Sequence, residues 1–134
     1  MNQLSMYLKA NVSGTLSTVS KGLPDARPFQ FQFIEDGKLI FATSSTKTVY
    51  EQLLDNPFIA YTTQTDDGTV VRIYGEVKFI DDLHIKEKIL LQQPQMKLMF
   101  QSSENPMMKV FYLDHGKATV CNLKSNQAPL NFIF

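Results

Sequence analysis

Apolar and polar residues alternate along most of this chain, which is the pattern of β-strands that bury one face. The clearest alternation places Phe29, Phe31 and Phe33 on one face of a strand that starts near residue 27. It places Gln30 and Gln32 on the other face, which we therefore expect to be polar. A two-residue period of this kind predicts a strand rather than a helix.

The same pattern recurs in short segments separated by turn residues. The other expected strands cover residues 11–20, 38–43, 58–64, 69–80, 110–113, 118–123 and 130–134. Glycine and aspartate mark the turns at residues 21–25, Asp36-Gly37, Asp66-Asp67-Gly68 and Asp114-His115-Gly116. The last residues are apolar enough that we expect a sheet or a subunit interface to hold them.

Helical patterns are short. The expected helices cover residues 4–8, about 46–56, 83–93 and a shorter piece at 95–101. Pro57 and Pro94 follow two of them, as expected because helices end before proline. Asp81 or Asp82 can cap the helix that starts at residue 83. Together these elements predict a mostly β fold, a small β-barrel of antiparallel strands with short helices, in a single domain of residues 1–134.

Composition excludes several classes of protein. Lys plus Arg and Asp plus Glu both total 13, and this balance argues against nucleic-acid binding, which needs a basic excess. No apolar run approaches the ~20 residues that span a membrane, and the first ten residues lack the pattern of a signal peptide. Cys121 is the one cysteine, so no internal disulfide can form. These features predict a cytoplasmic protein.

Residues 41–57 form the first candidate site. They read as a strand end, a hydroxyl-rich turn and a short helix, with Lys47 in the first helical turn. A cation is unfavourable at a helix N-terminus unless an anion lies near it. Hydroxyl side chains surround the lysine at Ser44, Ser45, Thr46 and Thr48. The stretch therefore resembles a phosphate cradle. Ordinary N-capping, or an ion pair with Glu51 worth only ~0.2–0.5 kcal/mol, are the competing interpretations.

Arg27-Pro28 forms the second candidate. Proline removes a backbone donor, so within a strand it indicates an edge or a bulge, and such irregularities often re-aim groups toward a site. Arg27 is either an ordinary solvated charge or a fixed cation for a phosphate or a negatively charged ring.

These segments together resemble the pyridoxamine 5'-phosphate oxidase-like family, whose members are flavin-binding split β-barrels. The resemblance rests on Arg27-Pro28-Phe29, residues 36–44, residues 47–57, Arg72-Ile73-Tyr74-Gly75-Glu76-Val77 and Val110-Phe111-Tyr112-Leu113. It follows the order of elements along nearly the whole chain. The true oxidases carry a C-terminal segment with tryptophan and arginine, whereas this chain has no tryptophan. It is more similar to the short, general-stress-type branch.

The family resemblance implies a homodimer that binds FMN at the subunit interface. It places the isoalloxazine ring and ribityl chain along Arg27, Pro28, Phe29 and Gln30. It places further ring or ribityl contacts, mostly through the backbone, at Phe41, Ala42, Thr43 and Ser44. It assigns the phosphate to Lys47 and Thr48.

The function implied is that of an FMN-dependent oxidoreductase or flavin reductase that uses a nicotinamide nucleotide or another small electron donor. The alternatives are a non-catalytic module that binds flavin, haem or a deazaflavin, and a structural dimer without a cofactor. No catalytic residue is assigned, because the flavin itself carries the redox chemistry. His84 and His115 lack a second ligand at metal-binding spacing, so no metal site is expected.

Overall fold

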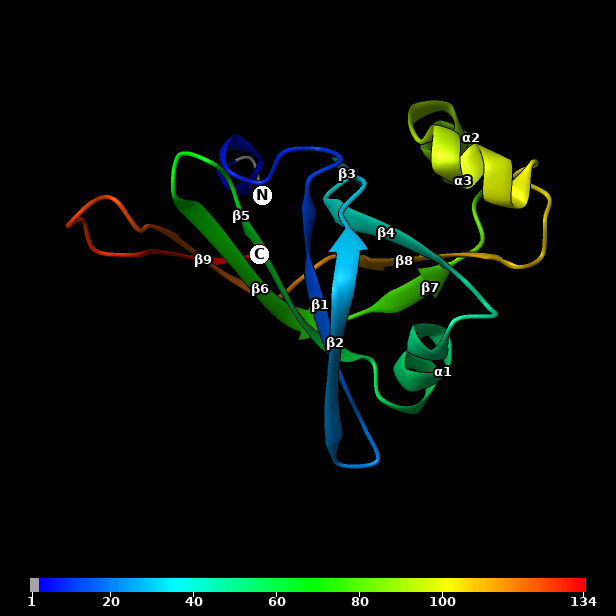
Figure 1. Cartoon of the computed structure of the whole chain (residues 1–134), viewed down its shortest axis with the longest axis horizontal. Helices are drawn as coiled ribbons and strands as arrows, with labels where there is room; N and C mark the ends of the chain where they lie inside the picture. The colour runs from blue at the N-terminus through cyan, green and yellow to red at the C-terminus, as the bar shows by residue number, and fades with distance from the viewer. Residues whose placement is uncertain (1–2) are drawn as a thin grey trace.

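The computed structural model describes residues 3–134 (Figure 1). Its strands are β1 Ser13–Ser20, β2 Leu23–Gln30, β3 Phe33–Glu35, β4 Lys38–Ser44, β5 Phe58–Gln64, β6 Thr69–Glu76, β7 Lys78–Ile80, β8 Met108–Leu113, β9 Lys117–Asn122 and β10 Leu130–Ile133. Its helices are α1 Thr48–Asp55, α2 Leu83–Gln92 and α3 Pro94–Phe100. The helix expected at residues 4–8 is a single 3-10 turn, Leu4–Met6.

The strands close into an antiparallel barrel. One sheet has the order β10-β9-β6-β5-β1-β2 and the other the order β3-β4-β8-β7. β2 leads into β3 and β6 into β7, so the chain itself joins the two sheets at two corners. The circuit through β1, β2/β3, β4, β8, β7/β6 and β5 is therefore continuous, and all of its strand pairs are antiparallel. The predicted fold class, a mostly β barrel with short helices, is confirmed.

One of these corners corrects the prediction for the phenylalanine strand. That strand ends at Gln30, and β3 begins at Phe33 in the other sheet. Phe31 packs inside the barrel, whereas Phe33 packs in a second core with α2 and α3, so the two do not share a face. Gln32 was predicted on a polar face and is instead fully buried, and its side-chain amide has no hydrogen-bond partner among residues 3–134. Alternation along the sequence cannot show where a strand turns from one sheet to the other.

The strand predicted over residues 69–80 divides in the same way. β6 ends at Glu76, Val77 is buried at the corner, and β7 starts at Lys78. The Val77 N–H donates to the Pro57 carbonyl at 2.9 Å, so the corner is held against the end of the α1–β5 connection.

β4 is covered on both faces. Leu39 and Phe41 point into the barrel, while Ile40 and Ala42 contribute to the core with α2 and α3. Figure 1 shows α2 and α3 on one side of β7 and β8 and α1 on the other. This double covering explains why β4 is apolar along most of its length instead of alternating.

Two tight hairpin turns set the register around β2 and β4. Lys21 and Gly22 have φ values of 54° and 76°, and Asp36 and Gly37 have φ values of 50° and 72°. Positive φ at both central residues is what a two-residue type I′ turn requires. The turn expected over residues 21–25 is therefore only two residues long, and β2 starts at Leu23. Within residues 3–134, no helix is both long enough and apolar enough to cross a membrane.

Candidate functional site

An opening lies between β2 and β4. β3 pairs with β4 only at residues 38–40, and β2 pairs only with β1. No strand pairing within the described residues joins residues 27–30 of β2 to residues 41–44 of β4, and we call this opening the split. The Ile40 carbonyl accepts the Gln32 N–H at 3.0 Å on this side of β4. By the two-residue period of a strand, the Ala42 carbonyl also points toward the split.

The two predicted cofactor-binding segments form the opposite edges of the split. The Phe29 and Phe41 rings lie inside the barrel behind the split, with their centres 6.2 Å apart. Pro28 lies on β2, an edge strand, as its missing backbone donor predicts. The Phe41 and Ala42 side chains are buried, so only their backbone can reach a ligand in the split.

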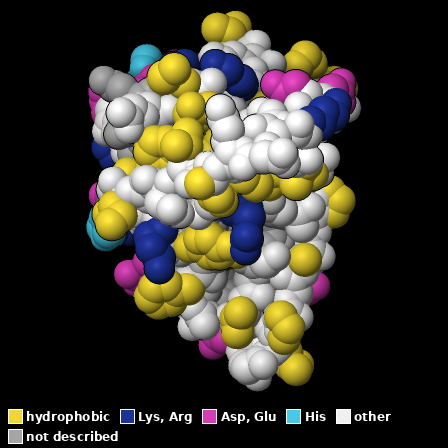
Figure 2. All heavy atoms as spheres, turned by 90° about the vertical axis from the view of Figure 1, so that its left-hand side faces the viewer, with side chains coloured by type: hydrophobic (Ala, Val, Ile, Leu, Met, Phe, Trp, Pro, Cys, Tyr) yellow, Lys and Arg dark blue, Asp and Glu magenta, His cyan; other side chains and the backbone are white. Residues whose placement is uncertain are grey.

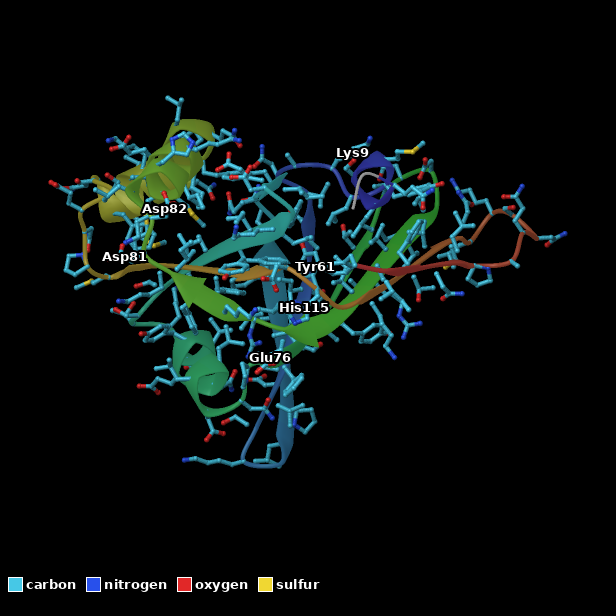
Figure 3. All side chains as sticks on the ribbon, turned by 180° about the vertical axis from the view of Figure 1, so that it is seen from behind. Lys9, Tyr61, Glu76, Asp81, Asp82 and His115 are labelled. Atoms are coloured by element: carbon cyan, nitrogen blue, oxygen red, sulfur yellow. The ribbon has the colours of Figure 1, made fainter. Side chains whose placement is uncertain are left out.

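Tyr61 holds one edge of the split in place. Its ring is buried in the barrel, and its hydroxyl donates to the Phe29 carbonyl at 2.9 Å (Figure 3). Burial raises the pKa of Tyr61, so the hydroxyl remains a donor throughout the physiological range. A tyrosine in an alternating strand carries no signal that separates this role from ordinary packing, and our sequence analysis missed it.

Helix α1 begins at the end of β4 without a side-chain cap. Lys47 is the N-cap residue, with extended backbone, and not part of the first turn as predicted. Its side chain is exposed, and among residues 3–134 no carboxylate lies within 4.0 Å of its ammonium, Glu51 included. The ion-pair interpretation of Lys47 is therefore wrong, and the start of α1 carries excess positive charge.

Three hydroxyls lead from β4 to this helix. The Ser44 hydroxyl lies 2.8 Å from that of Thr46 and accepts the Thr46 N–H at 3.2 Å, so these residues form a turn and do not cap α1. Thr43 is only 7% exposed, and its hydroxyl makes no hydrogen bond within the described chain. The capping interpretation therefore fails for both Ser44 and Thr46, and Thr43 has an unused polar group.

Arg27 is bound within the protein and is not a solvated charge. Its guanidinium donates to the Leu16 carbonyl at 3.2 Å, to the Thr18 hydroxyl at 3.1 Å and to the Gln52 side chain on α1. It also lies 3.2 Å from the Asp25 carboxylate. This network ties α1 to β1 and β2. The hydrogen bond from Gln52 is the main cause that lowers the pKa of Asp25, with smaller contributions from the Ala26 N–H and Arg27.

Two further residues near the split, Gln52 and Lys109, carry no signal in the sequence. Gln52 connects Arg27 and Asp25, and its position on the β1 side of α1 follows only from the packing of that helix. Lys109 on β8 lies opposite Thr43 in the strand pairing, a neighbour that sequence separation hides.

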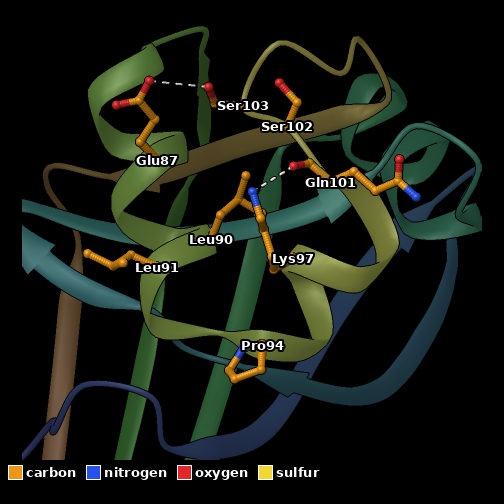
Figure 4. A pocket seen from close by; sticks show the side chains of 8 residues that line it. All are labelled: Glu87, Leu90, Leu91, Pro94, Lys97, Gln101, Ser102 and Ser103. Atoms are coloured by element: carbon orange, nitrogen blue, oxygen red, sulfur yellow. Dashed lines mark hydrogen bonds between the residues drawn. The ribbon is translucent and has the colours of Figure 1, made fainter.

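Neither histidine contributes to the split. His84 on α2 lies 3.8 Å from the Glu35 carboxylate, and His115 lies in a turn beside Asp114. Among residues 3–134, no three His, Cys, Asp or Glu side chains gather closely enough to hold a metal ion. A surface groove of about 560 Å³ lies instead between α2 and α3, where Leu90, Leu91 and Pro94 form its apolar wall (Figure 4).

This geometry defines a class of protein: a split antiparallel barrel in which a helix without a side-chain cap begins just after β4. The family model described as pyridoxamine 5'-phosphate oxidase matches residues 2–122. The chain therefore belongs to the pyridoxamine 5'-phosphate oxidase-like family. No curated protein matches it closely enough to count as a relative.

Solved structures share the fold over almost the whole chain. A NimC/NimA family protein from Clostridium acetobutylicum is 28% identical with a TM-score of 0.87, covering 100% of this chain and 93% of that one. General stress protein 26 from Bacillus anthracis is 18% identical with a TM-score of 0.77, covering 98% and 97%. A pyridoxamine 5'-phosphate oxidase-related, FMN binding protein from Nostoc punctiforme is 16% identical with a TM-score of 0.63, covering 91% and 86%.

Proposed function

We propose that this protein binds FMN at the split and works as an FMN-dependent oxidoreductase or flavin reductase. The observation that carries the proposal is the start of α1, where a helix N-terminus without a side-chain cap meets a lysine that no carboxylate of the described residues pairs with. A phosphate monoester carries about −1.5 to −2 charges at neutral pH and fits this excess of positive charge. A member of the same fold is described as an FMN binding protein, which supports the choice of phosphorylated ligand.

Residues along the split have distinct roles in this proposal. Lys47 and the backbone at Thr48 hold the phosphate, and Thr43 and Ser44 contact the ribityl chain, mostly through their backbone. The backbone of residues 41–42 and the edge formed by Arg27, Pro28, Phe29 and Gln30 orient the ring. Bound FMN supplies hydride and single-electron transfer, and a nicotinamide nucleotide or another small donor supplies the electrons.

The open face of the larger sheet supports the proposed homodimer. Hollows of about 200 and 480 Å³ meet at Tyr74 on this face, and no helix covers them. Figure 2 shows basic side chains among apolar ones on the side where β5, β6 and β9 lie. Phe58 on β5 and Ile133 on β10 are 59% and 88% exposed. A second copy meeting this face would cover the apolar groups and complete a site at the split with its own residues.

The dimer is tested by adding a charge to this face. Ser17→Arg, on the hollow that Arg72 also lines, should convert the protein to a monomer in light scattering, because two like charges would meet in the interface. Ser102→Arg on the α3–β8 connection is the matched control and should leave the mass unchanged. A wild-type protein that is already monomeric would rule out the dimer.

Flavin binding is tested by colour and by a matched pair of ligands. Purified protein should be yellow or should take up added FMN, and Lys47→Ala should weaken FMN binding while leaving riboflavin binding unchanged. The loss should amount to ~1.5–3 kcal/mol, the value of a charge-assisted hydrogen bond. Absence of any FMN affinity would falsify the proposal, and equal losses for both ligands would remove Lys47 from the phosphate site.

A binding module without turnover is the second candidate. Arg27 is the only ionisable side chain among residues 27–30 and 41–44, and it is already bound in its network. The two edges therefore offer no side chain for acid–base chemistry. Reduction of bound flavin by NADH or NADPH, followed by transfer to an acceptor, distinguishes an enzyme from a store or carrier, which would bind flavin without being reduced.

A further inference from the structure

Lys109 lies on β8 directly opposite Thr43 of β4. Leu39 and Phe41 on β4 and Phe111 on β8 point into the barrel, so the two-residue period of both strands places Thr43 and Lys109 on this inner side. They lie where β4 ends and α1 begins. Lys109 therefore lies on the strand beside the end of β4 that leads to the proposed phosphate site, a neighbour that sequence separation hides.

A second contact fixes the direction of the Lys109 side chain. Its ammonium lies 5.7 Å from the centre of the Tyr50 ring. Tyr50 is in the first turn of α1, and its N–H donates to the Lys47 carbonyl at 3.1 Å. The centre of the Tyr50 ring also lies 5.4 Å from the centre of the Phe79 ring. The ammonium of Lys109 faces the ring of Tyr50, so its charge lies beside a residue of the first turn of α1.

No carboxylate neutralises Lys109. Among the residues that the structure describes, none lies within 4.0 Å of its ammonium. Lys86 lowers the pKa of Asp81, which lies just before α2, and the charge of Lys109 adds to this effect (Figure 3). Asp81 is already bound to the Lys86 ammonium at 2.6 Å. Two cations, Lys47 and Lys109, thus flank one uncapped helix start, with the unpartnered Thr43 hydroxyl, 7% exposed, beside them.

We propose that Lys109 is a second phosphate-binding cation of the site, contacting the phosphate from β8 while Lys47 contacts it from α1. This inference rests on the proposed function. Two lysines match the double charge of a phosphate monoester, so the pair selects FMN over riboflavin more strongly than Lys47 alone does.

Lys38 offers a matched control for the experiment. It lies in the same sheet, at the other end of β4, and its ammonium stands 5.5 Å from the Tyr112 ring, close to the geometry of Lys109. FMN and riboflavin are titrated against the wild type, Lys109→Met, Lys109→Arg and Lys38→Met. Lys109→Met should weaken FMN binding by about tenfold or more and riboflavin by less than about twofold. Lys109→Arg and Lys38→Met should bind both ligands nearly as the wild type does.

Unchanged FMN affinity in Lys109→Met, in a protein that does bind FMN, overturns this inference alone. A wild-type protein that binds neither flavin overturns the proposed function and this inference with it. Lysine acetylation of the wild type, followed by mass spectrometry, needs no variant. FMN should slow the modification of Lys47 and Lys109 but not of Lys38, and riboflavin should protect none of them. If Lys109 is acetylated equally fast in the presence of FMN and of riboflavin, this second experiment also overturns the inference.

Discussion

Helices α1 and α2 begin in opposite ways. At α2, the Asp82 carboxylate accepts the Ile85 N–H at 3.1 Å, and the neighbouring Asp81 binds Lys86. At α1, Lys47 stands where a cap would be, and no side chain of residues 3–134 accepts the free N–H groups. A cap stabilises a helix by about 1 kcal/mol, so α1 forgoes a stabilisation that α2 has. The difference separates a helix start that serves only the fold from one that leaves room for an anion.

Reversing the charge at the start of α1 should have the largest effect. Lys47→Asp supplies the missing cap and a charge that suits the helix dipole, so the free energy of unfolding should rise by about 1 kcal/mol. The same carboxylate repels phosphate, so FMN affinity should fall by roughly 100-fold or more. Urea unfolding and flavin fluorescence measure the two effects. Riboflavin is the control ligand, and a variant that loses stability and keeps FMN would contradict the comparison.

Removing the arginine beside α1 should have a different signature. Arg27→Met removes the guanidinium donor from the Leu16 carbonyl and leaves the Gln52 side-chain oxygen with the Thr18 hydroxyl as its donor, which should cost about 1–3 kcal/mol of stability. If Arg27 also meets the ring, both flavins should lose affinity by the same factor, unlike the FMN-selective loss at Lys47. Gln52→Leu is the control for loosening of α1. Should it weaken flavin binding as much as Arg27→Met does, Arg27 acts only by positioning that helix.

Removing the cap of α2 should destabilise the fold without touching the ligand. Asp82→Ala should lower the free energy of unfolding by about 1 kcal/mol, because the Ile85 N–H loses its acceptor. Asp82→Asn keeps an acceptor and should lose less. Flavin affinity should be the same in all three proteins. A change in FMN binding on either substitution would mean that the two helix starts are not independent.

Lowering the pH should have the smallest effect of these tests, and it should act on the start of α2 through the Asp81 carboxylate. The hydrogen bond and charge of Lys86 lower the pKa of Asp81 below its ordinary value of 3.8. A lowered pKa means that this stabilisation is present above pH 3.8 and is lost as the pH falls through the folded-state value. The difference in thermal stability between wild type and Asp81→Asn should therefore shrink on going from pH 5 toward pH 2. A constant difference would show that the Asp81–Lys86 pair contributes nothing.

Local pattern predicted the strands, the turns, the strand edge at Pro28 and the lysine near the start of α1, whereas the other cofactor-binding residues were predicted from the family resemblance. The hairpin at Asp36-Gly37 and the cap at Asp82 are examples, since turn and cap residues act within a few positions of the backbone they satisfy. The sequence did not predict the corners after Gln30 and Glu76. The alternation of apolar and polar residues continues through a corner, but the side chains beyond it pack in a different core. Gln32 lies at such a corner and is buried.

The candidate site, like the fold, was predictable only where a local pattern marks it. Lys47 was found because a lysine near a helix start conflicts with the local field. Lys109 and Tyr61 were missed because their roles come from strand pairing and barrel closure, which join residues far apart in the chain. The contact of Arg27 with a cofactor ring remains a prediction, while its network with Gln52 is a property of the folded chain.

The split also bears on how this fold can change during evolution. The ring of strands is completed through β3, so residues 41–44 of β4 hold no strand on their open side. Phe41 and Ala42 on that edge are fixed by the two cores they fill, whereas Thr46, Lys47 and Thr48 at the start of α1 are exposed and can change while the barrel stays closed. A lineage can therefore exchange one bound molecule for another in small steps, without passing through an unfolded ancestor.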